Sequence, residues 1–211
     1  MGYKKDAKWV LEIQKTLAIP LIYTQVWPNC EIKCLDDNED DQLKKILDIS
    51  GADKLIKWKN GTVSFLGQRF RTYESSLAKD YDDFTLRKER PQTDYKAECY
   101  KIIDALENGK LLAAYYAYGH VNIKETGFEK FRILHFRRFI EKWVNNELEP
   151  YQQPYNKDNS SNFYAWAFNK IPQECIFWEL KEPITLTETD PPREYTQFNL
   201  ADFMRGGTMI D

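Results

Sequence analysis

Residues 54–72 read KLIKWKNGTVSFLGQRFRT, and this stretch decides the fold. Residues 54–59 mix Leu, Ile and Trp with lysines, and residues 62–72 form a longer strand-like run. Between them, Asn60-Gly61 is the strongest short-range signal for a hairpin turn. The sequence therefore predicts a β-hairpin.

Helix and strand signals lie on both sides of the hairpin. Trp9, Ile13 and Leu17 recur at a spacing of four and predict an amphipathic helix, which Pro20 is expected to end or kink. After the hairpin the pattern predicts alternating strands and helices, with strands at 84–87, 111–118, 131–135, 163–168 and 177–178 and helices at 41–49, 93–108 and 136–146.

Composition limits the class of protein. Of the 211 residues, 42% are hydrophobic and 15% aromatic, which excludes an intrinsically disordered chain. A net charge of −3 argues against nonspecific coating of nucleic acid by the whole surface. No apolar run reaches the ~18 residues of a transmembrane helix, and the charged start of the chain has no apolar leader segment. We therefore expect a cytoplasmic protein that does not enter a membrane.

Acidic and basic side chains gather on the predicted hairpin. Asp53 begins its first strand, and Gln68 and Arg69 lie in its second strand. Metal-dependent cleavage of a phosphodiester needs hard oxygen ligands and a cation that stabilises charge. Neighbouring strands can present such groups on one face, because side chains alternate with a period of two. Asp53, Gln68 and Arg69 are therefore candidate catalytic residues.

The order of helix, Asp-bearing strand, Asn-Gly turn, long polar-basic strand, third strand, helix and strand resembles the PD-(D/E)XK nuclease superfamily over roughly residues 4–120. The resemblance implies an αβββαβ, restriction-endonuclease-like core in an α/β (α+β) fold, with a central mixed β-sheet flanked by helices and C-terminal additions. It also implies Mg²⁺ or Mn²⁺ as cofactor, cleavage of DNA and a homodimer. The implied metal ligands are Asp53, Gln68 and Asp83, with Asp82 and Glu12 as alternatives to Asp83.

The predicted second strand departs from this pattern because it contains no acid. The residue two before Arg69 is Gly67, and Gln68 needs a β-bulge to share a face with Arg69. Simpler explanations stay open: Asp53 as a turn residue, Gln68 and Arg69 as the polar face of an edge strand, and Asp83 as an ordinary loop acid.

Basic residues point to nucleic acid as a partner. Residues 54–71 contain five cations and no acid, and a second basic cluster spans residues 130–142. Lys and Arg side chains contact phosphates, and exposed aromatic rings stack on bases. The alternative for the second cluster is a helix whose charged face is balanced by Glu129 and Glu141. The candidate DNA-binding residues are Lys57, Lys59, Arg71, Arg87, Arg132, Arg137 and Arg138.

The expected organisation is a nuclease-like core at 1–120, an additional segment at 121–180 and an extended Pro/Thr-rich tail at 181–211. Residues 121–180 either complete the sheet or form a recognition subdomain. The leading hypothesis is a Mg²⁺-dependent DNA endonuclease. The alternative is a noncatalytic nucleic-acid- or protein-binding module, an inhibitor or adaptor, that uses the acidic segment 36–41 and the tail to contact a partner protein.

Overall fold

The computed structural model describes residues 3–34, 52–73, 82–89, 91, 97–110, 112–152 and 161–187, with side chains from residue 8 onward except at 33, 34 and 152. The acidic segment 36–41, the helix predicted at 41–49 and the chain beyond residue 187 lie outside the described residues. None of the helices in the described ranges has the length and apolar character needed to span a membrane.

The N-terminal helix is longer than the sequence predicts. It runs through α1 (Tyr3–Ile13), the π-helical segment η1 (Gln14–Tyr23) and α2 (Thr24–Val26), so Pro20 does not end it. Proline is tolerated here because the wider π-helical turn moves away the carbonyl that its ring would otherwise meet. The Thr24 hydroxyl also donates to the carbonyl oxygen of Pro20 at 2.9 Å.

Seven of the described strands form one mixed sheet. The predicted hairpin is present as β2 (Lys54–Lys57) and β3 (Val63–Thr72), and β5 (Tyr115–Val121) lies parallel to β3 on its other side. The remaining pairs are antiparallel, and the order is β1-β2-β3-β5-β6-β10 with β9 also on β6. The additional strands are β1 (Glu31–Cys34), β6 (Gly127–His135), β9 (Ile176–Glu179) and β10 (Ile184–Thr185).

A second sheet of three strands has the order β4-β8-β7. Its first strand, β4 (Asp83–Glu89), is the strand predicted to follow the hairpin, but it pairs with β8 (Asn162–Ala167) rather than with the hairpin. In the large sheet β3 lies between β2, which pairs with residues 63–66, and β5, which pairs with residues 66–72. Residues 121–180 consequently contribute strands to both sheets, with β7 (Tyr151–Gln152) at the edge of the second.

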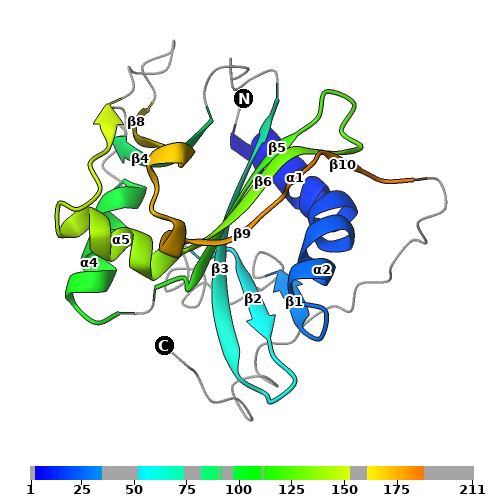
Figure 1. Ribbon diagram of the computed structural model, residues 1–211, viewed down its shortest axis with the longest axis horizontal. Helices are drawn as coiled ribbons and strands as arrows, with labels where there is room; N and C mark the ends of the chain where they lie inside the picture. Colours follow the sequence, from blue (N-terminus) through cyan, green and yellow to red (C-terminus); the bar gives the residue numbers. More distant parts are fainter. Residues whose placement is uncertain are drawn as a thin grey trace.

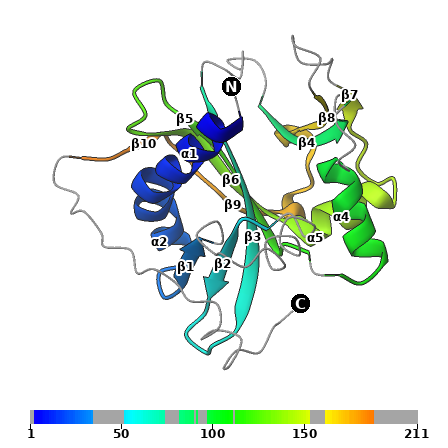
Figure 2. The same cartoon turned by 180° about the vertical axis from the view of Figure 1, so that it is seen from behind.

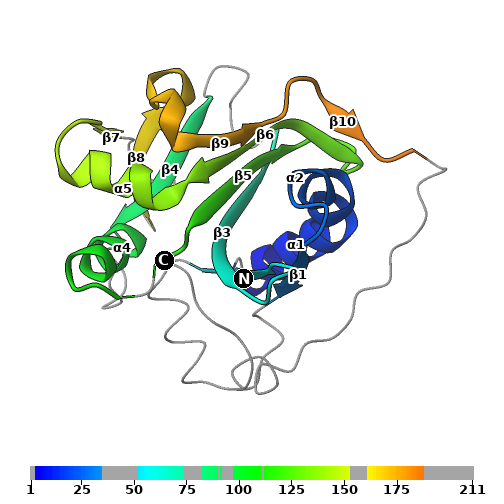
Figure 3. The ribbon, with the colours of Figure 1, turned by 60° about the horizontal axis from the view of Figure 1, so that its bottom comes forward.

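The large sheet lies between two layers (Figure 3). α1, η1 and α2 cover one face, and the second sheet covers the other together with α4 (Glu98–Glu107) and α5 (Phe136–Val144), as seen from both sides in Figures 1 and 2. Two short 3₁₀ helices, η2 (Phe168–Lys170) and η3 (Gln173–Cys175), complete the described elements. The architecture is thus mixed α/β, with a mixed sheet flanked by helices.

Each face of the large sheet has its own apolar core. On the side of the N-terminal helix, Leu66 and Phe70 of β3 pack with Leu17 and Ile22. On the other side, the fully buried Phe84 of β4 sits in an aromatic cluster, with ring centroids 4.9 Å from Phe139 and 5.2 Å from Tyr116. Even-numbered residues of β3 therefore face the N-terminal helix, and odd-numbered residues face the second sheet.

A substitution at Gly119 of β5 can test how tightly side chains pack on the face of the large sheet that the N-terminal helix covers. A Cβ at this position would lie 2.8 Å from Cδ2 of Phe131 and 2.9 Å from Cε1 of Phe128. We expect Gly119→Ala to lower the free energy of unfolding by about 1–3 kcal/mol, because neighbouring rings must shift. Urea denaturation measures this change. Lys124→Ala in the exposed β5–β6 turn is the control, and equal stability of the two variants would contradict the packing argument.

Candidate functional site

Gln68 and Arg69 point to opposite faces of the large sheet. The pairing of β3 with β5 runs through these residues without a bulge, so the strand alternates regularly. The side chain of Gln68 is buried against the N-terminal helix, where its Nε2 donates to Oε1 of Gln14 at 2.9 Å and its Oε1 accepts from the Tyr23 hydroxyl at 3.2 Å. Gln68 thus anchors the helix to the sheet and does not join Arg69.

Asp53 lies directly before β2 and belongs to the Arg69 face. Its Oδ2 accepts a hydrogen bond from the backbone N–H of Gln68 at 2.7 Å, and its own N–H donates to Leu66 O at 3.0 Å. The predicted association of Asp53 with the second hairpin strand is therefore present, through the backbone of Gln68 rather than its amide group.

Arg69 joins three elements of the fold. Its Nη1 donates to the carbonyl oxygen of Thr85 on β4 at 2.9 Å, and its Nη2 pairs with Oε2 of Glu98 on α4 at 2.9 Å. Glu98 begins α4, and its Oε1 accepts from the Tyr116 hydroxyl of β5 at 3.0 Å. The cation predicted from the hairpin therefore meets a carboxylate that lies 29 residues further along the chain.

These contacts determine the charge state of the group. Burial alone would raise the pKa of Glu98, but the Arg69 guanidinium and hydrogen bonds from the Arg87 backbone and the Tyr116 hydroxyl hold that pKa below its ordinary value. Burial and the adjacent Glu98 carboxylate raise the pKa of Tyr116, and Asp53 acts in the same direction. Asp53, Glu98 and Arg69 therefore all influence the pKa of the buried Tyr116 hydroxyl, which stays neutral.

Arg71 extends the group along β3. Its Nη2 donates to the Thr85 hydroxyl at 2.7 Å, and its guanidinium lies 5.6 Å from the ring centroid of Tyr118. The buried Asp83 accepts a hydrogen bond from the Tyr151 hydroxyl at 2.8 Å and lies 3.9 Å from Nη1 of Arg71. Asp83 is thus placed beside Arg71.

We call this group the intersheet cluster, because it lies where β3 and β5 of the large sheet meet β4 and α4. The side chains of Arg69, Arg71 and Glu98 remain 19%, 24% and 20% exposed, so the cluster is accessible from solvent. Its members are Asp53, Arg69, Arg71, Thr85, Glu98, Tyr116 and Tyr118.

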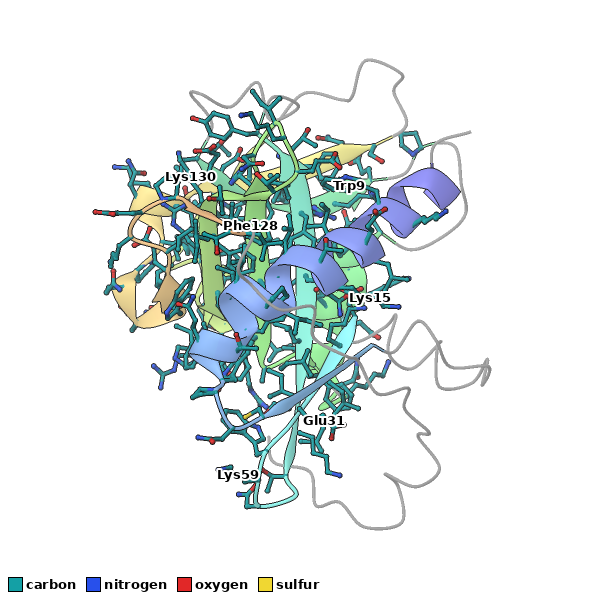
Figure 4. All side chains as sticks on the ribbon, turned by 90° about the vertical axis from the view of Figure 1, so that its right-hand side faces the viewer. Trp9, Lys15, Glu31, Lys59, Phe128 and Lys130 are labelled. Atoms are coloured by element: carbon teal, nitrogen blue, oxygen red, sulfur yellow. The ribbon has the colours of Figure 1, made fainter. Side chains whose placement is uncertain are left out.

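The other predicted DNA-binding residues are dispersed. Lys59 lies at the hairpin tip, far from Lys130 in the view of Figure 4. Arg132 is held by both oxygens of Asp82 at 2.6 and 2.8 Å and by Glu179 at 2.7 Å. The remaining positions are Lys57 on β2, Arg87 on β4 with its guanidinium 5.7 Å from the Phe163 ring, and Arg137 and Arg138 on the exposed side of α5.

On α5, Arg137 pairs with Glu141 at 3.1 Å, so that part of the helix face is charge-balanced. Of the predicted DNA-binding residues, Arg71 belongs to the intersheet cluster. Arg87 and Arg132 border it, since the backbone N–H of Arg87 donates to Glu98 at 3.2 Å and Arg132 is the register partner of Tyr118.

Among the side chains that the structure describes, no three of His, Cys, Asp and Glu lie together as a metal-binding group. Mg²⁺ is commonly held by one or two carboxylates, with water and substrate phosphates completing its shell. In the intersheet cluster, Asp53 and Glu98 fit that donor chemistry. Gln68 lies on the other face of the sheet, and Asp83 lies beside Arg71 and accepts from Tyr151. Glu98 also accepts hydrogen bonds, from Arg69, the Arg87 backbone and Tyr116, so a metal ion would have to replace at least one of these contacts.

Comparison with protein-family models, with curated proteins and with solved structures finds no match. The function is therefore argued from the geometry of this chain.

Sequence reasoning missed Glu98, Thr85 and Tyr116. Glu98 lies inside the predicted helix 93–108, whereas α4 begins at Glu98, where an acid has an ordinary stabilising role. Thr85 alternates with the apolar Phe84 and Leu86, and Tyr116 lies in an apolar run. Only the three-dimensional contacts that join β3, β4, β5 and α4 distinguish these residues from structural ones.

His120 of β5 adjoins the cluster and is 2% exposed. Burial lowers its pKa to about 4, and the nearby Arg71 acts in the same direction. The unfolded chain therefore binds a proton more readily than the folded protein between about pH 6.5 and pH 4.

We expect the free energy of unfolding to fall as the pH falls through this window, with His120 contributing up to about 3 kcal/mol. His120→Phe should flatten that slope, as measured by urea denaturation at several pH values. His135→Phe is the comparison and should flatten it less, because His135 is partly exposed. Identical slopes in the wild type and His120→Phe would refute the assignment.

Proposed function

We propose that this protein is a Mg²⁺- or Mn²⁺-dependent DNA endonuclease with a restriction-endonuclease-like core, active at the intersheet cluster. The observation that supports the proposal most strongly is the position of Glu98. The second hairpin strand lacks the acid expected for metal-dependent cleavage, and Glu98 brings a carboxylate to the same face as Asp53 and Arg69. The cluster therefore contains two acids and a cation.

The topology agrees with this proposal in part. The N-terminal helix, the hairpin β2–β3, α4 and β5 occur in the sequence order of the αβββαβ core, and β5 lies parallel to β3. The chain adds β1, which pairs with β2, between the helix and the hairpin. A further difference is β4, which pairs with β8 in the second sheet. That difference moves Thr85 and α4 over the face of β3, where Thr85 and Glu98 contact Arg69.

Each residue then has a defined role. Asp53 and Glu98 would hold the metal ion, which when bound polarises the scissile phosphodiester and activates a water molecule. The low pKa of Glu98 keeps its carboxylate ionised at neutral pH. Arg69 remains cationic, so it stabilises negative charge and cannot serve as a base. Arg71 and Arg87 are placed to contact backbone phosphates, and the Gln68 backbone N–H orients Asp53.

The first test is nicking of supercoiled plasmid with Mg²⁺, Mn²⁺ or EDTA. We expect metal-dependent nicking that Asp53→Asn and Glu98→Gln each reduce by at least about 100-fold, because each loses a ligand charge. Both replacements keep a hydrogen-bond acceptor, but Glu98→Gln leaves Arg69 without its carboxylate and lowers stability by about 3 kcal/mol, so thermal unfolding is used to find conditions in which each variant is folded. Glu107→Gln, at the exposed end of the same helix, is the control. Nicking by Glu98→Gln at the wild-type rate would rule out its role.

A noncatalytic nucleic-acid- or protein-binding module is the second candidate. It is favoured by the direct pairing of Arg69 with Glu98 and by the burial of Gln68 on the opposite face. In such a module the cluster would serve only to join the two sheets and α4. DNA is the proposed partner of the endonuclease and of a nucleic-acid-binding module. Further proposals common to both candidates are a homodimer, contact of residues 181–211 with another protein and a cytoplasmic location.

Metal binding separates the two candidates. A ligand that binds only the folded state stabilises it by about 2.7 kcal/mol at 100 times its Kd. For a chain of this size that corresponds to a rise in Tm of about 5–10 °C. We expect millimolar Mg²⁺ or Mn²⁺ to raise the Tm of the wild type and of Glu107→Gln but not of Asp53→Asn. Equal Tm values with metal and with EDTA would favour the binding module.

A further inference from the structure

Three adjacent strands present Arg71, His120 and Lys130 side by side. Arg71 of β3 is the register partner of His120 on β5, and His120 is the partner of Lys130 on β6. Register partners project from the same face of a sheet. This row therefore lies on the face that also presents the intersheet cluster, two residues beyond Arg69 along β3.

His120 is the unusual member of the row. Its side chain is 2% exposed and packs edge-on against Tyr118, with ring centroids 5.5 Å apart. Its Nε2 atom is buried and has no hydrogen-bond partner in the described part of the chain. Buried ring nitrogens normally have a partner, and an unsatisfied one costs about 1–3 kcal/mol. A donor or acceptor supplied by a ligand would remove that cost.

The charges around His120 show what kind of ligand fits. Arg71, Lys130 and Arg132 are its cationic neighbours, and Asp82 is the acidic one. Arg132 already uses both oxygens of Asp82 in a two-pronged ion pair and also binds Glu179, whereas Lys130 lies 3.6 Å from Asp82. Arg71 and Lys130 are also the partly exposed members, at 24% and 34%. An anion can therefore reach Arg71 and Lys130, where it competes with Asp83 at 3.9 Å and Asp82 at 3.6 Å. The side chains over the buried Nε2 of His120 must shift for the anion to accept the third hydrogen bond.

We propose that Arg71, His120 and Lys130 form a phosphate-binding subsite for the nucleic-acid strand, next to the intersheet cluster. The two cations hold the phosphate oxygens, and the neutral imidazole donates one hydrogen bond from Nε2–H without adding charge. The subsite rests on the proposed function for the identity of its ligand. It lies two residues, about 7 Å, along β3 from Arg69. We assign the phosphate bound here to the same strand as the scissile one.

The first experiment uses inorganic phosphate, without metal and in EDTA, against sodium chloride at equal ionic strength. We expect phosphate to raise the Tm of the wild type, and Arg71→Gln and Lys130→Gln to lose most of that rise. Lys110→Gln removes one charge at the far end of α4, beside Asp104, and should keep it. Since phosphate also stabilises proteins nonspecifically, an equal rise in all four proteins would overturn the subsite.

A second measurement reports on His120 directly. A bound anion stabilises the protonated imidazole, so phosphate should raise the pKa of His120 from about 4 in an NMR titration of its ring protons. His135 provides the internal reference within the same spectra. An unchanged His120 titration at a phosphate concentration that raises Tm would remove His120 from the subsite.

Oligonucleotide binding in EDTA identifies the source of the phosphate. Arg71→Gln should weaken binding and reduce the salt dependence of log K by about one unit. Equal affinity for 5′-hydroxyl and 5′-phosphorylated strands assigns the subsite to a backbone phosphodiester, and preference for the 5′-phosphate assigns it to a strand end. Wild-type affinity and salt slope in Arg71→Gln and Lys130→Gln would overturn the proposal. Because these assays need no cleavage, their result is independent of the nicking test.

Discussion

The ion pair between Arg69 and Glu98 is the interaction on which the intersheet cluster depends. It connects β3 of the large sheet to α4, and the same guanidinium reaches β4 through Thr85. Removing one partner of a buried pair leaves an uncompensated charge at a cost of about 3–5 kcal/mol, and the partial exposure of both side chains places this pair at the lower end. The pair thus sets the position of the second sheet over the first and gives the cluster its second carboxylate.

Strand alternation is the constraint that divides the polar residues of β3. Gln68 faces the N-terminal helix and closes a buried network with Gln14 and Tyr23, while Arg69 faces the second sheet. One strand therefore joins the large sheet to both of its covering layers through adjacent residues. A bulge that moved Gln68 to the Arg69 side would leave Gln14 and Tyr23 without this partner, so the regular register and the buried network support each other.

Local features could be predicted from the sequence, and nonlocal ones could not. The Asn60-Gly61 turn, the strands beside it and the helix at 136–146 depend on short-range patterns, and all are present. The partner of β4 depends on a strand that begins 79 residues after Asp83, at Asn162. Asp53 and Arg69 could be predicted as members of one face, whereas Glu98 could not, because its role depends on where α4 docks. Pro20 failed as a helix end because the turn around it widens.

Two rows of register partners cross β3, β5 and β6, and they differ in how closely their cations are paired with acids. In the first, Arg69, Tyr118 and Arg132 are register partners, and each arginine is matched by acids: Glu98 for Arg69, and Asp82 and Glu179 for Arg132. The second row consists of Arg71, His120 and Lys130. Lys130 lies 3.6 Å from Asp82, which Arg132 contacts at 2.6 Å, and Arg71 lies 3.9 Å from Asp83, which Tyr151 contacts at 2.8 Å. Both arginines of the first row are therefore paired with acids, and these ion pairs hold the sheets together. The second retains unused donor capacity, which is the property that a binding row requires.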